Sequence, residues 1–447
     1  MKFLVIGGDA AGMSAASRAK RNRPDLEVTV LEKTMDVSYS ACGMPYNIAA
    51  PDRDMDTLVV RKADVFREKQ GINLLTGHNA QFLDPARRVV EGTVSGGRDF
   101  SLPYDRLLIA TGASPVVPQV EGVDLPGVFP LKSLEDGRKI KQYLAENTVK
   151  KAFIAGMGFI GLEMCEALME RGISVDMIRR SGNFIPWLPM DMCRFVRTEA
   201  EKRSVGMHFN QGLKRIEKTE KGLKVVTTAL EFEADLVILA LGVTPNSDFA
   251  VKAGIEVGKH QELSVNRALE CSVEHVYAAG DCADAYHVVT GEKTWIPLAL
   301  RANRAGWAVA DTVCGTRTEL PGVAGTAVFK FFDLQVARTG LSYDEAVASG
   351  FEAVEETVKT RSRAHGHPGS GDIWVQMVGD RRSGRLLGAF MAGKEGVAHR
   401  INAPAVALSA RMNVSDYIQS DLAYAPPFGP VWDPTLTAAI QLAKKME

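Results

Sequence analysis

The sequence predicts an α/β protein with two Rossmann-like dinucleotide-binding domains and a C-terminal α+β domain. A pattern of apolar strand, glycine-rich turn and Ala-rich helical segment occurs twice, at residues 3–21 and 152–171. From about residue 325 onward, β-rich stretches replace this pattern, and a helical tail follows them. The length of 447 residues also exceeds what one hydrophobic core usually serves. We therefore expect three domains.

Two similar segments predict where the chain crosses between domains. LLIATGASPVVP at 107–118 and DLVILALGVTPN at 235–246 each contain an apolar strand followed by residues rich in glycine and proline. After the second segment the chain returns to its first domain, which is therefore discontinuous. The predicted domains are residues 1–118 with 246–324, residues 119–245, and residues 325–447.

The first glycine turn contains Gly7, Gly8 and Gly12 between a strand and a helix, where backbone N–H groups and the helix dipole bind a pyrophosphate. Asp9 occupies the place of the middle glycine, so we expect its carboxylate to point away from the phosphates. Glu32 ends the next strand, where an acid accepts hydrogen bonds from an adenosine ribose. This turn predicts a dinucleotide with an unmodified ribose.

The second glycine turn contains Gly156, Gly158 and Gly161 in the full dinucleotide-binding spacing. Arg179 and Arg180 stand where the acid of the following strand is expected. A guanidinium pairs with a 2′-phosphate, so these arginines favour NADPH. NADH is the alternative if both arginines only end an exposed strand.

Cys42 lies in the segment VSYSACGMPYNIAA. Gly43 and Pro45 follow it and predict a loop-to-helix junction, where we expect the helix N-terminus to lower the pKa of the thiol. A redox dithiol would have its second cysteine five residues on, where this chain has Asn47. A redox cycle would therefore run on one sulfur, as a mixed disulfide or a sulfenic acid.

The composition limits the partners and the compartment. Lysine plus arginine (53) nearly balance aspartate plus glutamate (54), so no bulk field attracts nucleic acid or an anionic membrane. No apolar run approaches the roughly 18 residues that span a bilayer. Six cysteines without a CxxC pair suit a reducing compartment. We expect a cytoplasmic protein that has no metal site and binds neither nucleic acid nor membrane.

Six segments carry a resemblance to a known family. They are SYSACGMPY around Cys42, ATGA at 110–113, GMGFIGLE at 156–163, AAGDCA at 278–283, PLALRANRAG at 297–306 and DLAYAPPFGPVWDP at 421–434. Together they resemble the single-cysteine flavoprotein disulfide reductases, which include coenzyme A disulfide reductases, NAD(P)H persulfide or polysulfide reductases and related NADH oxidases. The resemblance covers essentially the whole chain.

This resemblance implies positions for two cofactors. It implies that FAD binds at the first glycine turn and Glu32, with Thr111 and Gly112 of the ATGA segment as further cofactor-binding residues and Asp281 on the ribityl chain. It also implies that Glu163 lies close to the nicotinamide of NAD(P)H.

The resemblance further implies a homodimer with a shared active site. The third domain of one subunit would cover the Cys42 pocket of the other and bring Tyr424 near the sulfur, as a general acid or to orient substrate. A structural tyrosine in a rigid loop is the alternative. Arg18 and Ser38 stand where similar proteins hold coenzyme A.

Two departures from the family pattern bear on the substrate. Ala41 replaces the asparagine that usually precedes the cysteine of coenzyme A disulfide reductases. Residues 363–368, with His365 and His367, replace a Tyr-Tyr-Pro stretch of their active site. A free imidazole titrates at about pH 6.5, so these histidines are candidates to protonate a departing thiolate or to bind an anionic polysulfide. A solvated loop is the alternative.

The sequence thus predicts hydride transfer from NADPH to FAD, followed by reduction of a sulfur bonded to Cys42. The predicted acceptor is a disulfide, persulfide or polysulfide, with coenzyme A disulfide and coenzyme A persulfide as the leading candidates. Two alternatives stay open. One is an oxidase or peroxidase in which Cys42 cycles through sulfenic acid, and the other is a flavin-bearing redox sensor with little turnover.

Overall fold

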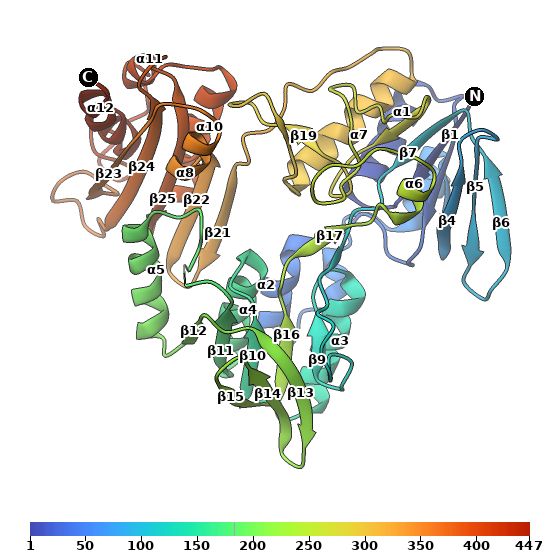
Figure 1. Cartoon of the computed structure of the whole chain (residues 1–447), viewed down its shortest axis with the longest axis horizontal. Helices are drawn as coiled ribbons and strands as arrows, with labels where there is room; N and C mark the ends of the chain where they lie inside the picture. Colours follow the sequence, from blue (N-terminus) through green and yellow to red (C-terminus); the bar gives the residue numbers. More distant parts are fainter. Residues whose placement is uncertain (183) are drawn as a thin grey trace.

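The computed structural model describes residues 1–182 and 184–447, and in these residues three units each contain a five-stranded sheet (Figure 1). Two of the sheets are parallel and one is antiparallel. The predicted α/β fold class is therefore confirmed.

The first unit contains a parallel sheet in the order β18-β7-β1-β2-β3. Residues 3–6 of β1 are all buried, because this central strand is covered on both faces. The strands are β1 (Lys2–Ile6), β2 (Glu27–Glu32), β3 (Asn73–Thr76), β7 (Arg106–Ile109) and β18 (Val276–Ala278). The helices of this unit are α1 (Ala10–Asn22), α6 (Asp248–Lys252) and α7 (Ala299–Val313).

Close packing of α1 against α7 fixes the start of α1. A Cβ atom at Gly306 of α7 would collide with the backbone of Ala11. Only a glycine lets the two helices approach this closely. The N-terminus of α1, at the first glycine turn, is thereby held against α7.

Smaller elements complete the first unit. An antiparallel sheet is formed by β4 (His78–Asp84), β5 (Val89–Val94) and β6 (Asp99–Pro103), and a hairpin by β19 (Ala285–Tyr286) and β20 (Lys293–Thr294). Short helical turns are η1 (Ala41–Gly43), α2 (Met44–Ala49), η2 (Met55–Leu58) and η3 (Val65–Lys69). The two predicted crossing segments lie side by side, because β8 (Ala113–Pro115) pairs with β17 (Val243–Pro245).

The second unit repeats the parallel architecture in the order β12-β11-β10-β16-β9. Its sheet strands are β9 (Val128–Pro130), β10 (Lys151–Ala155), β11 (Ser174–Arg179), β12 (Gly206–Phe209) and β16 (Leu236–Leu239). Its helices are α3 (Leu134–Glu146), α4 (Phe159–Glu170) and α5 (Met190–Lys202). A three-stranded antiparallel sheet is added by β13 (Leu213–Thr219), β14 (Gly222–Thr227) and β15 (Glu231–Ala234).

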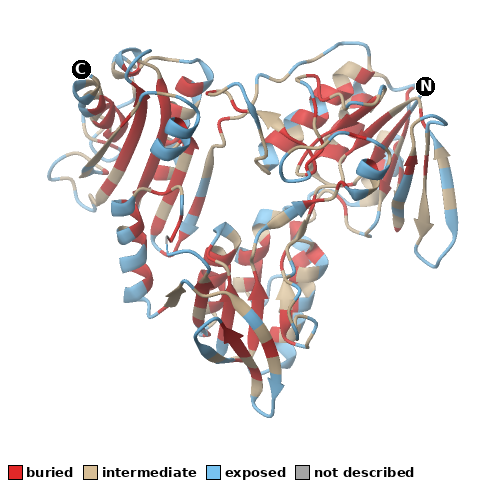
Figure 2. Ribbon diagram, viewed as in Figure 1, coloured by how far each residue is buried: buried red, intermediate tan, exposed pale blue. Residues whose placement is uncertain are grey.

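The third unit contains an antiparallel sheet in the order β21-β22-β25-β24-β23. Its central strand β25 is buried along its whole length (Figure 2). The strands are β21 (Ala327–Phe331), β22 (Leu334–Gly340), β23 (Ala353–Arg361), β24 (Asp372–Asp380) and β25 (Leu386–Gly393). The helices are α8 (Tyr343–Ala348), α9 (Val397–Arg400), α10 (Asn402–Ser409), α11 (Val414–Ile418) and α12 (Pro434–Met446).

Aromatic contacts join the second unit to the third. The ring of Phe159, at the start of α4, lies 5.1 Å from that of Phe329 in β21. The ring of Trp187 lies 6.2 Å from that of Phe390 in β25. Buried residues of both units belong to one apolar cluster. The third unit therefore supports the helix that follows the second glycine turn.

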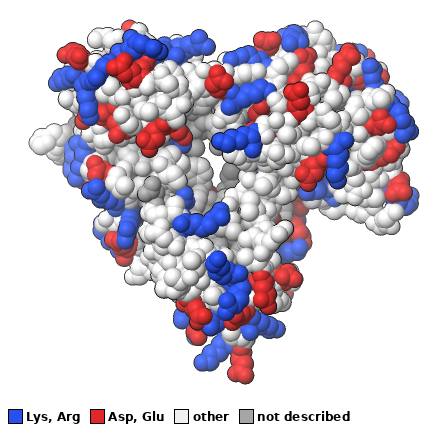
Figure 3. All heavy atoms as spheres, viewed as in Figure 1, with Lys and Arg blue, Asp and Glu red and all other residues white. Residues whose placement is uncertain are grey.

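Acidic and basic side chains are interspersed on the face shown in Figure 3, as the net charge of −1 suggests. Within the described part of the chain, no helix has the length and apolar character needed to cross a membrane.

Candidate functional site

The first glycine turn has the geometry of a dinucleotide-binding loop. Gly7 has φ +114°, and its N–H donates to the Leu31 carbonyl at 2.8 Å. The Gly8 N–H donates to Glu32 Oε2 at 2.8 Å, which fixes the carboxylate beside the turn. No side chain fits at Gly12, because a Cβ there would collide with the Gly7 carbonyl. The turn before α1 is therefore as tightly packed as the motif requires.

Asp9 turns its carboxylate toward the neighbouring loop. It makes no side-chain cap of α1, and its Oδ1 accepts from the Tyr39 N–H at 3.3 Å. Burial raises the pKa of Asp9 to about 6, and the nearby Glu32 acts in the same direction. Asp9 therefore binds a proton at a higher pH than an ordinary aspartate, although it is still mostly ionised at neutral pH.

The second glycine turn repeats these contacts. The Gly156 N–H donates to the Ile178 carbonyl at 3.0 Å, as Gly7 does to Leu31. Arg179 follows Ile178 as Glu32 follows Leu31, so Arg179 occupies the position of the ribose-binding acid. Its Nε donates to Ser181 Oγ at 2.8 Å, and the neighbouring Arg180 is exposed.

Cys42 lies in η1, directly before α2, and is exposed in the single chain. The protein around it nevertheless raises the pKa of the thiol, first by desolvation and then through the carboxylate of Glu163. Lys132 lowers it, while Asp281 and Asp9 raise it further. The prediction of a lowered pKa is wrong for the polypeptide itself, because desolvation and three carboxylates outweigh the start of a six-residue helix.

Glu163 and Tyr46 join the two glycine-turn units beside this thiol. Tyr46 lies one helical turn after Cys42, and its hydroxyl donates to Glu163 Oε1 at 2.8 Å. Burial raises the pKa of Glu163, and the Tyr46 hydrogen bond partly opposes this. The helix α4, whose N-cap is Gly158, thus places the Glu163 carboxylate against the segment that contains Cys42.

Lys132 pairs with Asp281 at 2.9 Å and belongs to the same group of charges. The sequence motifs predicted Asp281 but missed both Lys132 and Tyr46. Tyr46 stands four residues after the cysteine, so helical spacing alone would indicate a shared face. Lys132 gives no such signal, because it reaches the site from the segment between β9 and α3.

Thr111 and Gly112 hold the crossing segments together. The Thr111 hydroxyl donates to the Asn246 carbonyl at 2.6 Å, and the Gly112 carbonyl accepts from the Asn246 N–H at 2.9 Å. Gly112 has φ +68°. These contacts fix the turn after β7, next to Gly7.

Ser38 lies at the first glycine turn and Arg18 further along α1. Ser38 has φ +50°, and its N–H donates to the Gly8 carbonyl at 3.0 Å. Arg18 makes a bidentate ion pair with Asp311, at 2.7 and 2.8 Å, and lies over the Trp307 ring. The guanidinium predicted to bind coenzyme A therefore already has an acidic partner.

Tyr424, His365 and His367 lie together in the third unit. The Ala364 N–H donates to the Pro426 carbonyl at 3.1 Å, which joins the histidine loop to the tyrosine loop. Tyr424 and His365 are exposed. In Figure 1 the loop between β23 and β24 lies at the outer edge of the molecule, well apart from α2, so one chain does not bring these residues to Cys42.

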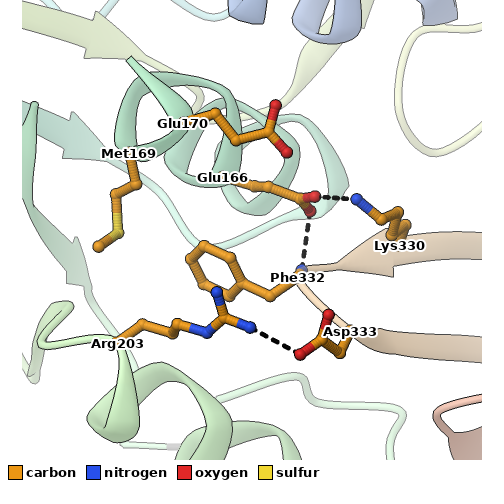
Figure 4. Close-up of a pocket in the computed structure, with 7 residues that line it drawn as sticks. All are labelled: Glu166, Met169, Glu170, Arg203, Lys330, Phe332 and Asp333. Atoms are coloured by element: carbon orange, nitrogen blue, oxygen red, sulfur yellow. Dashed lines mark hydrogen bonds and ion pairs between the residues drawn. The ribbon is translucent and has the colours of Figure 1, made fainter. Parts of the chain in front are cut away.

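A hollow of about 210 Å³ lies where α4 meets the third unit (Figure 4). Glu166 of α4 is buried, pairs with Lys330 and accepts from the Phe332 N–H at 2.8 Å. Arg203 pairs with Asp333 at 2.6 Å on its other side. Ion pairs line the hollow, and those of Glu166 attach α4 to the third unit. Over the described chain, no group of three His, Cys, Asp or Glu residues is placed to hold a metal ion.

Comparison with known proteins agrees with this arrangement. The family model described as pyridine nucleotide-disulphide oxidoreductase matches residues 1–306, and the model of that family's dimerisation domain matches residues 326–434. The NAD(P)H sulfur oxidoreductase (CoA-dependent) of Pyrococcus furiosus is 39% identical over 440 residues, covering 98% of each chain. The NADH oxidase of Methanocaldococcus jannaschii is 32% identical over 447 residues, covering 100% of this chain and 99% of its own.

A solved structure shows the same fold. The NAD-dependent persulfide reductase from A. fulgidus superposes with a TM-score of 0.95 and 34% identity, covering 100% of this chain and 83% of that chain. The family that the six sequence segments indicate is confirmed, and membership implies FAD and NAD(P)H as cofactors. The chain belongs to the pyridine nucleotide-disulphide oxidoreductases.

Proposed function

We propose that this protein uses NADPH and FAD to reduce the sulfur–sulfur bond of a disulfide, persulfide or polysulfide through Cys42. The observation that carries the proposal is the group around that thiol. Glu163 lies on α4, the helix that follows the second glycine turn, and Asp281 lies near the first glycine turn. Asn47 takes the place of a second cysteine. The sulfur and persulfide relatives support this chemistry.

The residues of the first unit fit FAD. Gly7, Gly8 and Gly12 allow the tight turn before α1 because a Cβ at any of them would collide with a neighbour, and Glu32 is held in place for a ribose.

The residues of the second unit fit NADPH. A Cβ at Gly158 would meet nothing within 4 Å, so space lies open at the N-terminus of α4. Arg179 stands at the ribose position, with exposed Arg180 beside it. Two guanidinium groups favour a 2′-phosphate over a free hydroxyl.

The mechanism begins with removal of a proton from Cys42. Its thiol pKa is raised, so the thiol is protonated near neutrality and needs a base. Glu163 is the proposed acceptor, because its own pKa is raised and it is held beside Cys42 by Tyr46. The Cys42 thiolate attacks one sulfur of the substrate, the substrate sulfur–sulfur bond breaks, and the departing sulfur takes a proton.

The bond between Cys42 and the remaining substrate sulfur must then accept two electrons. When bound, FAD would supply these two electrons from NADPH. Reduction of this bond would regenerate the Cys42 thiolate and release a second reduced thiol, or sulfide. Lys132 favours this thiolate electrostatically, because its ammonium lowers the Cys42 pKa.

The substrate pocket is proposed to be shared between two subunits. The match to a dimerisation domain supports a homodimer. The linked loops of Tyr424 and His365 expose large apolar side chains, including Phe428 at 78% and Trp432 at 59%. We place Tyr424, His365 and His367 over the Cys42 pocket of the other subunit, as proton donors or anion-binding groups.

Coenzyme A disulfide and coenzyme A persulfide are the proposed leading substrates. Ser38 beside Gly8 and Arg18 on α1 are the proposed coenzyme A contacts, and the Asp311 partner would limit what Arg18 contributes. All six cysteines are free thiols, which supports a reducing compartment such as the cytoplasm.

Replacing Cys42 by serine tests the function. The variant is expected to retain FAD and its reduction by NADPH, but to lose reoxidation of the flavin by coenzyme A disulfide or polysulfide. Anaerobic stopped-flow absorbance separates the two half-reactions. Cys314→Ser is the matched control, because that thiol is half-buried and lies elsewhere in the unit, against Ala19. Unchanged sulfur reduction in Cys42→Ser would refute the proposal.

Arg179→Glu tests the nucleotide preference. Loss of one charge-assisted hydrogen bond to a 2′-phosphate costs about 1.5–3 kcal/mol, so the ratio of kcat/KM for NADPH over NADH should fall by about tenfold to 100-fold. Arg194→Glu, on the exposed face of α5, is the charge control. An equal change in both variants would show that Arg179 does not bind the phosphate.

Alkylation of Cys42 tests the charges around the thiol. Glu163→Gln removes a carboxylate that raises the thiol pKa, so iodoacetamide should modify Cys42 faster at fixed pH. Lys132→Met removes a cation that lowers this pKa, so modification should be slower. The rates follow from mass spectrometry over a pH series, with Lys139→Met as the control. Shifts in the same direction for both variants would contradict this electrostatic account.

A further inference from the structure

The helix that follows Cys42 has an unusual support at its C-terminal end. The Lys141 ammonium donates to the Asn47 carbonyl at 3.2 Å, to Asn47 Oδ1 at 3.1 Å, to the Ala50 carbonyl at 2.9 Å and to the Arg53 carbonyl. Lys141 lies on α3, in the second unit, and the four oxygens lie in the first. One ammonium thus binds oxygens at both ends and in the middle of the segment 47–53.

A second cation of the second unit binds the same end. Arg171, the C-cap of α4, donates from its guanidinium to the Ile48 carbonyl at 3.0 Å. Unpaired carbonyls at a helix C-terminus carry partial negative charge, which cations stabilise. Burial lowers the pKa of Lys141, and Arg171 acts in the same direction, whereas Asp54 and Asp52 oppose it.

Asn47 is the centre of this arrangement. It is fully buried, and its Nδ2 donates to the Asp54 carbonyl at 2.9 Å and to Thr57 Oγ1 at 3.2 Å. Its Oδ1 accepts from Lys141. Every polar group of this side chain therefore has a partner, at the position where a redox dithiol would have its second cysteine.

The helix α2 has only six residues, which is too short to be stable without outside contacts. Its first turn begins two residues after Cys42, at Met44, and contains Tyr46, which binds Glu163. Displacement of its C-terminal end therefore moves both the thiol and Tyr46.

We propose that Lys141 is a positioning residue for Cys42, and that its ammonium bound to Asn47, Ala50 and Arg53 fixes α2 against the second unit. The inference rests on the proposed role of Cys42 in sulfur reduction. Three backbone carbonyls and one amide oxygen form the site, and such a group of oxygens also binds free monovalent cations. Lys141 acts as a tethered ammonium ion in this site.

Lys141→Met tests the inference, since it retains an unbranched side chain and removes the charge. Misplacement of a reacting group by about 1 Å costs up to about 100-fold in rate. The oxidative half-reaction with coenzyme A disulfide or polysulfide should therefore slow by about tenfold to 100-fold. Ammonium chloride should restore much of this rate, whereas tetramethylammonium chloride at equal ionic strength should not, because that cation has no N–H group.

Lys139→Met is the matched control, because Lys139 lies on the same helix and forms an ion pair with Glu135 at 3.6 Å. This variant should show the wild-type rate and no response to ammonium. A wild-type rate in Lys141→Met would overturn the inference. So would a loss of rate that ammonium does not restore in protein with the wild-type melting temperature.

Asn47→Ala is a second variant for the case in which Lys141→Met does not fold. It removes one of the four oxygens and keeps the ammonium, so it should lose part of the oxidative rate. An unchanged rate would contradict the inference. Wild-type protein and Cys42→Ser are measured alongside, because equal sulfur reduction in these two would refute the proposed function, independently of Lys141.

Discussion

The hydrogen bond between Tyr46 and Glu163 is the contact on which the arrangement of the site depends. A single-thiol enzyme needs the nucleotide of one unit and the sulfur of another within reach of one flavin. Tyr46 shares a short helix with the Cys42 junction, and Glu163 belongs to the helix that begins at the second glycine turn. This hydrogen bond therefore joins the first unit to the second beside Cys42.

The helix α4 transmits that constraint through the molecule. Gly158 is its N-cap, Glu163 accepts a hydrogen bond from Tyr46 near the thiol, and Glu166 is held by Lys330 of the third unit. A buried carboxylate is costly unless it is paired and hydrogen-bonded, and Glu166 has both kinds of partner. Loss of the Glu166 contacts would release α4 from the third unit, whose loops we place in the pocket of a second subunit.

Sequence reasoning identified the parts that depend on backbone geometry. The glycine turns could be recognised in the sequence because no other residue fits at positions such as Gly12. Gly7 and Gly156 each donate to the residue before Glu32 and Arg179, which shows that Arg179 stands at the position of Glu32. The direction of the Cys42 pKa could not be obtained in this way, because it depends on charges from distant segments. Lys132 and Lys141 were missed for the same reason, since neither lies near the cysteine in the sequence.

The central claim is that the protein transfers electrons from NADPH to the sulfur–sulfur bond of its substrate. The most direct test reduces the enzyme anaerobically with one equivalent of NADPH and then mixes it with coenzyme A disulfide, coenzyme A persulfide or oxygenated buffer, while the flavin absorbance is followed. We predict faster flavin reoxidation with a sulfur acceptor than with oxygen. Each flavin reoxidised should release two reduced sulfur groups, which are two thiols from coenzyme A disulfide or one thiol and one sulfide from coenzyme A persulfide. Reoxidation by oxygen alone, with no thiol or sulfide released, would contradict it and favour an oxidase.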